Sequence, residues 1–437
     1  MPTPLLAPRN GAYTFIDNDN GWRDCVDHVL DGAGPIAIDA ERASGFRYSQ
    51  RAYLIQIFRR GTGIYLIDPI ALTGSDHTER LNHHLRDEEW VIHASTQDLP
   101  CLHEFGIAPK KLFDTELGAR LAGFARVGLG PLTETLLDLT LAKEHSAVDW
   151  SKRPLHSDWL NYAALDVDVL LDIRDGVAAA LEEQNKLAWA EADFHSIITT
   201  FTSRAQSLTS LQSKKREPWR RTSGMHKVRS RRSAGCVKAL WEKRDAIARE
   251  IDIAPGRLLN DSLLVELALR APKTLDELMV QPEFKRIRNP LQRSYFQTWI
   301  TVLIACHELS EDELPPLRTS SDAMPPTKIW REKFPLAYAR YTHARALLSE
   351  CALAHNLPAE NLVTPDFYKQ LCWLSLEKPE FIGNIDRVAS ALMDLGARQW
   401  QINLVAPCIA QALTESEPIE LSPASDEKIE PADGGNP

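Results

Sequence analysis

The sequence predicts an α/β domain, in which helices flank a mixed β-sheet, followed by all-helical domains. Residues 11–203 alternate short β-prone runs with amphipathic helical stretches, the pattern of a layered α/β fold. A basic segment at 204–233 interrupts this pattern. From there to residue 413, apolar residues recur at helical spacing in two stretches of similar order. We therefore expect one α/β domain and two helical domains.

The composition is that of an ordinary globular protein. Of the 437 residues, 44% are hydrophobic and 25% are charged, which is enough apolar material for several domain cores. No apolar run reaches the roughly 18 residues of a membrane helix, and the first residues do not resemble a signal peptide. Seven cysteines are scattered without a C-x-x-C pair, which predicts reduced thiols rather than disulfides or zinc ligands. We expect a cytoplasmic protein with no membrane partner.

Charge is distributed unevenly along the chain. The formal net charge is −10, yet residues 213–232 contain nine Lys or Arg and one Glu. Residues 414–437 contain seven Asp or Glu and one Lys, and this acidic, proline-rich composition is typical of a disordered tail. Because a polyanion responds to local charge, the negative total does not exclude a nucleic-acid partner.

The first predicted strand ends in two acids. Residues 36–41 (Ile-Ala-Ile-Asp-Ala-Glu) follow a turn that contains glycine and proline. Side chains two positions apart on a strand point to the same face, so Asp39 and Glu41 converge on one point. Held together in a cleft, the two carboxylates repel each other unless a cation lies between them. The alternative is a solvated, acidic strand end, which is common.

Further strands and helices complete the predicted α/β domain. Residues 53–58 and 63–68 are β-prone and are joined by a hairpin turn, so with the first strand they predict a three-stranded meander. A helix at 75–86 and a fourth strand at 90–93 follow. The later helices are expected at 97–105, 114–121, 132–139 and 157–182. No glycine-rich phosphate loop follows a strand, which disfavours a nucleotide-driven motor or a dehydrogenase.

Two more acids and a tyrosine lie at positions where a site could form. Asp98 falls in the first turn of the helix that follows the fourth strand. Ser95 and Asp98 have the spacing of a capping box, so a helix cap is the favoured explanation of Asp98 taken alone. Tyr162 and Asp166 lie one turn apart on one face of the last long helix. The alternative for this pair is a surface tyrosine beside a solvated aspartate.

The helical region contains an internal repeat. Apolar stripes predict helices at 234–250, 260–270, 274–279 and 290–306, and a similar order returns over 333–413. In each copy a short segment joins the first helix to the second: Pro-Gly-Arg-Leu-Leu-Asn at 255–260 and Pro-Ala-Glu-Asn-Leu-Val-Thr at 358–364.

The acids and the tyrosine form an ordered set that resembles one family. Their order resembles the tyrosine-containing branch of the DEDD 3′–5′ exonuclease superfamily, and the ribonuclease D family in particular: Asp39, Glu41, Asp98, Tyr162 and Asp166. The likeness covers roughly residues 11–200 and extends to four flanking segments: 54–57, 66–69, 113–115 and 149–155. The helical stretch 234–312 resembles an HRDC domain, and the stretch 330–413 resembles a diverged copy.

This resemblance implies a ribonuclease H-like fold and a 3′–5′ exoribonuclease that releases nucleoside 5′-monophosphates. It implies two divalent ions, Mg²⁺ or Mn²⁺, held by four acids: Asp39, Glu41, Asp98 and Asp166. It assigns to Tyr162 the orientation of the attacking water. Further substrate contacts are expected from four side chains: Phe46, Tyr48, Gln56 and His93.

The sequence departs from the family pattern directly after Glu41. Family members carry an aromatic residue near this point, whereas this chain has Arg42 and reaches its first aromatic at Phe46. The metal-binding carboxylates are unaffected. We therefore assign the wedging of the terminal nucleotide to Phe46 or Tyr48.

The expected partner is the 3′ end of single-stranded RNA, such as a tRNA precursor, and HRDC-type domains usually contact or position nucleic acid. A DNA substrate stays open, because contacts to the 2′-hydroxyl cannot be identified in a sequence. A catalytically silent nucleic-acid-binding protein is the third possibility, and the presence of all four acids and the tyrosine argues against it. The sequence gives no oligomeric state and no preferred metal.

Overall fold

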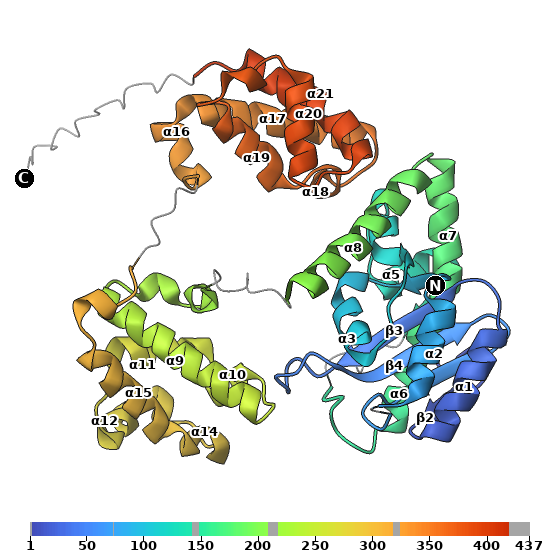
Figure 1. Ribbon diagram of the computed structural model, residues 1–437, viewed down its shortest axis with the longest axis horizontal. Helices are drawn as coiled ribbons and strands as arrows, with labels where there is room; N and C mark the ends of the chain where they lie inside the picture. Colours follow the sequence, from blue (N-terminus) through green and yellow to red (C-terminus); the bar gives the residue numbers. More distant parts are fainter. Residues whose placement is uncertain (1, 73, 142–147, 209–216, 318–323, 419–437) are drawn as a thin grey trace, which may run out of the picture. The chain divides into compact units, whose positions relative to one another are not determined.

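The chain folds into two compact units, Met1–Ser320 and Ser321–Pro437. The computed structural model describes residues 2–418 apart from positions 73, 142–147, 209–216 and 318–323. The first unit contains the α/β domain and a helical domain, and the second unit is helical (Figure 1). Most of the predicted acidic tail, from residue 419 onward, lies outside the described residues.

A six-stranded mixed sheet forms the centre of the α/β domain. Its strand order is β2-β5-β4-β3-β6-β7, with β4 antiparallel to β3 and β5 and the other neighbours parallel. The strands are β2 (Thr14–Ile16), β3 (Ile36–Arg42), β4 (Ala52–Arg59), β5 (Gly63–Ile67), β6 (Glu89–Ile92) and β7 (Lys111–Asp114). A separate parallel pair joins β1 (Thr3–Leu5) to β8 (Leu139–Leu141).

The predicted three-stranded meander is confirmed by the strand registers. Asp39 of β3 pairs with Gln56 of β4, which in turn pairs with Leu66 of β5. All eight residues of β4 are buried. Because alternate side chains point to opposite faces, this burial means that both faces of the sheet are covered. The edge strands β2, of three residues, and β7, of four, were not predicted.

Helices cover the sheet, and one of them carries Tyr162 and Asp166. Helix α6 (Ser157–Asp168) lies against β3, β4 and β5, and α7 (Leu170–Glu183) lies against β3 and β6. The other helices of the domain are α1 (Asp19–Asp31), α2 (Asp76–Leu85), α3 (Leu99–Phe105), α4 (Thr115–Leu121), α5 (Leu129–Leu137) and α8 (Leu187–Leu208).

The single helix predicted at 157–182 is wrong in one respect, because the structure interrupts it at Val169. Next to the interruption, Asp168 is buried, and its carboxylate accepts hydrogen bonds from Arg9 and Asn10. The Asp168 carbonyl oxygen also accepts a hydrogen bond from Arg9 Nη2 at 2.8 Å. These partners lie far away in the sequence, so local periodicity gives no sign of the interruption.

The helical domain of the first unit is built around α9 (Arg231–Glu250), which packs on α11 and α15. Its other helices are α10 (Pro255–Leu258), α11 (Asp261–Arg270), α12 (Leu275–Val280), α13 (Pro282–Lys285), α14 (Pro290–Ser294) and α15 (Phe296–Glu308). Part of the segment predicted as a linker folds onto this domain, since Trp219 and Val228 belong to its buried core.

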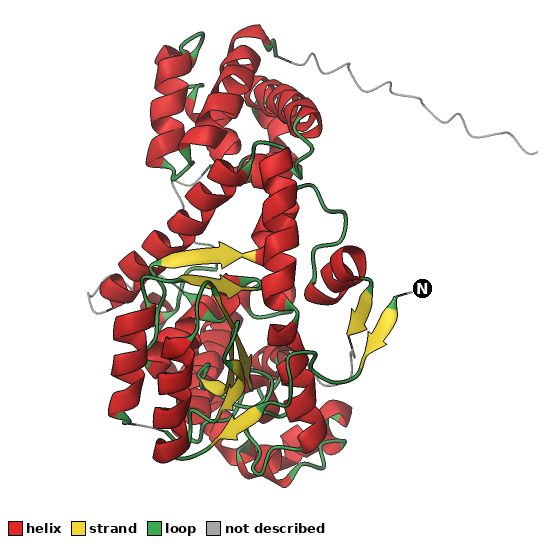
Figure 2. Ribbon diagram, turned by 90° about the vertical axis from the view of Figure 1, so that its right-hand side faces the viewer, coloured by secondary structure: helices red, strands yellow, loops and turns green. Residues whose placement is uncertain are grey.

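The second unit repeats the same helix order. Helix α17 (Pro335–Ala354) packs on α19 (Pro365–Leu374) and α21 (Gln399–Glu415), as α9 packs on α11 and α15. The short helices α10 and α18 (Ala359–Leu362) occupy the two echoing segments of the sequence. Helices α16 (Trp330–Lys333) and α20 (Ile385–Asp394) complete the unit. Figure 2 shows that helices outweigh strands throughout the chain.

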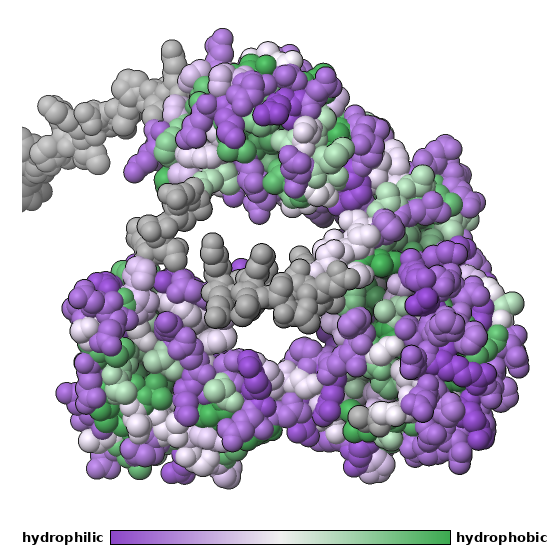
Figure 3. Space-filling model, viewed as in Figure 1, coloured by the Kyte–Doolittle hydropathy of each residue, from purple (hydrophilic) through white to green (hydrophobic). Residues whose placement is uncertain are grey.

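The apolar faces of these helices are turned inward, and the surface visible in Figure 3 is mostly hydrophilic. Within the described residues, no helix combines the length and the hydropathy needed to cross a bilayer. All seven cysteines are free thiols, and five of them are buried.

Candidate active site

Strand β3 brings the first two acids together. The strand is central in the sheet, and its register against β4 is regular from Ile36 to Glu41. Asp39 and Glu41 are both half-buried and project from the same face of the strand, as the period of two requires. The backbone of both acids pairs with β4, and the residues just before Asp39 also pair with β6.

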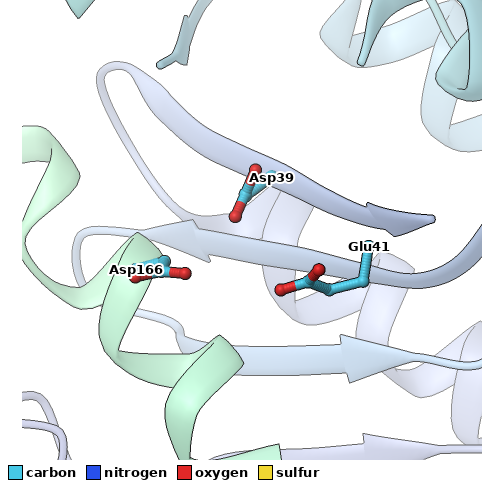
Figure 4. Close-up of side chains that lie close together, drawn as sticks. All are labelled: Asp39, Glu41 and Asp166. Atoms are coloured by element: carbon cyan, nitrogen blue, oxygen red, sulfur yellow. The ribbon is translucent and has the colours of Figure 1, made fainter. Parts of the chain in front are cut away.

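Helix α6 brings the third acid to the same point. Its buried face contains Ala163 and Ala164, whose small side chains allow the helix to lie close to the sheet. One carboxylate oxygen each from Asp39, Glu41 and Asp166 lie within 4.8 Å of one another. Figure 4 shows the three side chains pointing toward a common space. We refer to these residues together with Asp98 as the acid cluster.

Asp98 lies beside these three acids, where β6 gives way to α3. The predicted capping box is wrong: Ser95 begins a 3₁₀ helix, Ser95–Gln97, and the Asp98 side chain makes no capping hydrogen bond to α3. The Ser95 hydroxyl instead donates to Asp114 at 2.7 Å. The buried Asp98 carboxylate therefore has no part in helix capping, and Arg42 Nε lies 3.6 Å from its Oδ1.

Asp114 holds the turn that carries Asp98. Its carboxylate accepts hydrogen bonds from the backbone N–H groups of Ala94 and Ser95, and it also caps α4. Ala94 has a left-handed backbone conformation, with φ of 55°. Such a conformation costs free energy in a residue with a Cβ and persists because the surroundings hold it. Asp114 thus acts on the site through the backbone of this turn.

Burial and mutual repulsion raise the pKa values of the acids in the cluster. Burial is the main cause for each, and it raises the pKa of Asp98 to about 8, with the charge of Asp39 adding to the effect. The pKa of Glu41 lies well above its ordinary value because of burial and then the charges of Asp39 and Asp166. Burial likewise raises the pKa values of Asp39 and Asp166. Such a group of acids is stable in ionised form only with a counter-charge.

Tyr162 lies one turn before Asp166 on α6, at the edge of the cluster. Burial raises the pKa of its phenol, and the charges of Asp166, Glu41 and Asp39 raise it further. The phenol is therefore neutral at physiological pH. A neutral hydroxyl in this position can orient a water molecule by hydrogen bonding, but it cannot serve as a general base.

The donor set of the cluster fits a hard divalent cation. Every side chain that converges here offers carboxylate oxygen, which is the ligand type preferred by Mg²⁺ and Mn²⁺. The raised pKa values show that the acids lack sufficient counter-charge from the protein alone. The structure thus supports a divalent-metal site, and the identity of the ion does not follow from it.

Two of the four expected substrate contacts lie in β4 and directly after β6. Gln56 is fully buried in β4, opposite Asp39, and both polar atoms of its side chain lack a partner among the described residues. His93 follows β6, where its Nδ1 lies 2.9 Å from the Thr115 hydroxyl oxygen. Burial lowers the pKa of His93, so its imidazole is neutral at physiological pH.

The other two expected contacts lie in the loop after β3 and engage the helical domain. The Arg257 guanidinium lies 4.1 Å from the centre of the Phe46 ring, and the Phe46 carbonyl accepts a hydrogen bond from the Ala254 N–H. The Tyr48 hydroxyl donates to Asp245 at 3.0 Å. Both residues thus contact the helical domain, and their role toward substrate stays a prediction.

Sequence reasoning missed Arg42 as a member of the site. A local signal was present, because a cationic side chain directly follows Glu41 where related proteins have an aromatic residue. The alternation of side chains along a strand argued against a role for Arg42 in the site, since its side chain should point away from the face that carries Glu41. Contact with Asp98 shows that its side chain instead reaches the acids.

Three family models match successive parts of the chain. A model described as 3′–5′ exonuclease matches residues 13–182, an HRDC domain model matches residues 233–286, and a model described as 3′ to 5′ exonuclease C-terminal domain matches residues 323–413. Ribonuclease D of Escherichia coli is 27% identical over 409 residues, which cover 92% of this chain and 99% of that protein. The chain is therefore a relative of ribonuclease D that contains a 3′–5′ exonuclease domain and an HRDC domain.

Other similar proteins match over different lengths. Ribonuclease D of Granulibacter bethesdensis is 31% identical over 190 residues, which cover 43% of this chain and only 46% of that protein. A crystal structure of a protein from Bifidobacterium adolescentis is 35% identical, with a TM-score of 0.82, and covers 94% of this chain and 100% of that chain. The similarity in fold to this last protein extends beyond the exonuclease domain to the helical units.

Proposed function

We propose that the protein is a 3′–5′ exoribonuclease that releases nucleoside 5′-monophosphates one at a time from RNA. The observation that carries the proposal is the convergence of Asp39, Glu41 and Asp166 within a domain matched by the 3′–5′ exonuclease model. Relatives named ribonuclease D favour RNA over DNA as the substrate. We further propose single-stranded 3′ ends, such as those of tRNA precursors, as the form of RNA that it binds.

The proposed cofactor is a pair of Mg²⁺ or Mn²⁺ ions, which the acid cluster would hold. When bound, such a pair neutralises the charge on the phosphodiester and on its attacking and leaving oxygens. The four carboxylates would surround the ions, and their positions are set by β3, α6 and the turn before α3. The HRDC-type helical domain, proposed as residues 234–312, and its diverged copy, proposed as 330–413, would hold RNA further from its end.

The reaction is hydrolysis of the last phosphodiester. The oxygen of a water molecule bonds to phosphorus, the bond from phosphorus to the 3′ oxygen breaks, and that oxygen takes a proton. The phenol of Tyr162 keeps its own proton and orients the water by hydrogen bonding. The amide of Gln56 is proposed to contact substrate or an ordered water from the floor of the site.

The test follows the degradation of a 5′-labelled single-stranded RNA on a denaturing gel, with Mg²⁺, Mn²⁺ or EDTA. We expect a ladder that shortens from the 3′ end with either metal and is absent in EDTA. Asp98→Asn and Asp166→Asn should each abolish it, because each removes a charge that a metal needs while keeping side-chain shape. As a control, Asp24→Asn changes an exposed acid of α1 and should leave the ladder intact.

The same assay with labelled single-stranded DNA distinguishes the substrates. Degradation of DNA at a rate equal to or above that of RNA would contradict the ribonuclease assignment. Intact RNA and intact DNA with both metals would contradict the enzyme altogether.

A further inference from the structure

Arg42 is a cation at the edge of the acid cluster to which no function has been assigned. It is the last residue of β3 and directly follows Glu41. Its Nε lies 3.6 Å from Asp98 Oδ1, and its Nη2 donates a hydrogen bond to Gln97 Oε1 at 3.3 Å. The side chain is 26% exposed, whereas that of Asp98 is 7% exposed. The Arg42 side chain is therefore more open to solvent than the acid that it approaches.

The ladder between β3 and β4 becomes irregular next to Arg42. The register shifts between Glu41 and Arg42, so that Arg42 pairs with Ala52 and Tyr53 of β4 is the extra residue. Alternation along a regular strand would place Arg42 on the face of Ala40, away from Glu41. The long side chain of Arg42 nevertheless reaches Asp98, from the last residue of the strand, where the regular ladder stops.

The positive charge of Arg42 affects three of the four acids in the cluster. It lowers the pKa values of Asp39, Glu41 and Asp98, against the stronger effect of burial. Yet the contacts of Arg42 are loose: 3.6 Å is beyond hydrogen-bond distance, and the Gln97 contact is near the upper limit. A guanidinium has five N–H donors in a planar fork, and these contacts do not occupy the fork.

We propose that Arg42 binds the non-bridging oxygens of the scissile phosphate, so that it is a further catalytic residue of this site. The proposal rests on the proposed exonuclease function. A phosphodiester carries a negative charge that grows on the phosphoryl oxygens during attack, and a guanidinium fork matches two such oxygens. A metal cation on Asp98 would weaken the attraction that holds Arg42 to this acid. The guanidinium would then be available to bind the phosphate.

The competing explanation is that Arg42 only holds Asp98 in place for a metal ion. The two explanations differ in the predicted effect of Arg42 on metal binding. A residue that positions a metal ligand supports metal affinity, so its loss weakens metal binding. A cation that leaves Asp98 when metal enters opposes metal affinity, so its loss strengthens metal binding.

The experiment compares Arg42→Gln and Arg42→Lys with the wild-type protein, and it uses Arg23→Gln as a control. Arg23 is an exposed arginine of α1 that pairs with the adjacent Asp24. Its substitution changes the net charge by the same amount as Arg42→Gln, but at a residue outside the acid cluster. In the RNA assay, kcat/KM should fall about 100-fold in Arg42→Gln, as for loss of a donor to a developing oxyanion. Arg42→Lys should lose about 10-fold, because it keeps the charge and loses the fork. Arg23→Gln should match wild type.

Two binding measurements complete the test. Titration calorimetry with Mn²⁺ and no RNA should show affinity in Arg42→Gln equal to or tighter than in wild type. Fluorescence anisotropy with a labelled RNA in Ca²⁺ should show RNA binding weakened about 10-fold, as expected for a lost charged hydrogen bond. Weaker Mn²⁺ binding in Arg42→Gln, or unchanged RNA binding, would overturn the proposal. A wild-type protein that binds RNA but does not cleave it would contradict the proposed function, while the two binding measurements would still decide the role of Arg42.

Discussion

Buried carboxylates in the acid cluster make the stability of the protein depend on pH and metal together. The folded-state pKa of Asp98 is about 8, and those of Glu41 and Asp166 are also raised by burial and by neighbouring charge. In the unfolded chain the same groups titrate near ~4. At pH values between the unfolded-state and folded-state pKa values, the folded protein binds more protons than the unfolded chain. The free energy of unfolding therefore falls as pH rises through this range.

The first prediction concerns how metal changes this dependence. A divalent ion replaces the protons as counter-charge, so Mg²⁺ should stabilise the protein more at pH 8 than at pH 5. Thermal unfolding with saturating Mg²⁺ or with EDTA at the two pH values measures this. We expect a rise in Tm of several degrees at pH 8 and about 1 °C or less at pH 5.

The matched control for this prediction is Asp98→Asn, which keeps the shape of the side chain and removes its titration. Its Mg²⁺-induced rise in Tm should depend less on pH than that of wild type. Equal rises at pH 5 and pH 8 in the wild-type protein would show that the acids are not the groups that bind the ion.

At the scale of elements, strand β4 contains a buried polar side chain, Gln56, that lowers stability and so indicates a functional role. Gln56 lies between apolar residues in a strand whose residues are all buried, and its amide has no hydrogen-bond partner among the described residues. An unsatisfied buried amide costs about 1–3 kcal/mol. Its register partner Asp39 belongs to the acid cluster, so the Gln56 side chain lies on the same face of the sheet as that acid.

The second prediction is that Gln56→Met makes the protein more stable and less active. Methionine fills similar space without a polar group, so the free energy of unfolding should rise by about 1–2 kcal/mol in urea denaturation. The loss of one hydrogen bond to substrate or water should lower kcat/KM about 3- to 10-fold. Leu66→Met at the paired position of β5 is the control, and it should leave kcat/KM unchanged. A destabilised Gln56→Met would indicate that the amide is satisfied within the fold.

Elements with a strong local pattern were predictable, and those fixed by distant contacts were not. The apolar run before Asp39 and the hairpin after it gave the meander, because strand period and turn residues are local properties. The interruption between α6 and α7 depends on Arg9 and Asn10, which lie near the start of the chain. Neither pattern nor propensity in the helix itself contains that information.

The same distinction applies to the site. Asp39 and Glu41 could be paired from the sequence because they share one strand, and Asp166 joined them by resemblance rather than by pattern. The prediction of a capping box at Ser95 was wrong because the serine hydroxyl donates a hydrogen bond to Asp114, 19 positions later. Arg42 was missed because its contact with Asp98 joins two segments that lie far apart in the sequence. Phe46 and Tyr48 were assigned to substrate without knowledge that the helical domain contacts them.

At the scale of the whole molecule, the residues proposed for catalysis all lie in the first unit. The acid cluster, Tyr162 and Arg42 precede residue 200, and the helical domain that contacts Phe46 and Tyr48 also ends before Ser320. The second unit has its own core, in which α17 packs on α19 and α21 around buried residues: Leu348, Leu371, Val388 and Val405. Each unit therefore has the buried apolar material that independent folding requires.

The last prediction is that a chain ending at Ser320 folds and keeps its chemistry. Its cooperative thermal transition should survive, and kcat on an RNA of five nucleotides should stay within about 3-fold of the full-length value, since no proposed catalytic group is removed. A separate chain of residues 324–437 should show a helical circular dichroism spectrum and a cooperative melt of its own. Longer RNA should bind the shortened protein less tightly, because a helical unit proposed to hold RNA is missing. Loss of cooperative unfolding in the shortened chain, or loss of cleavage of the short RNA, would mean that the second unit is needed to form the site.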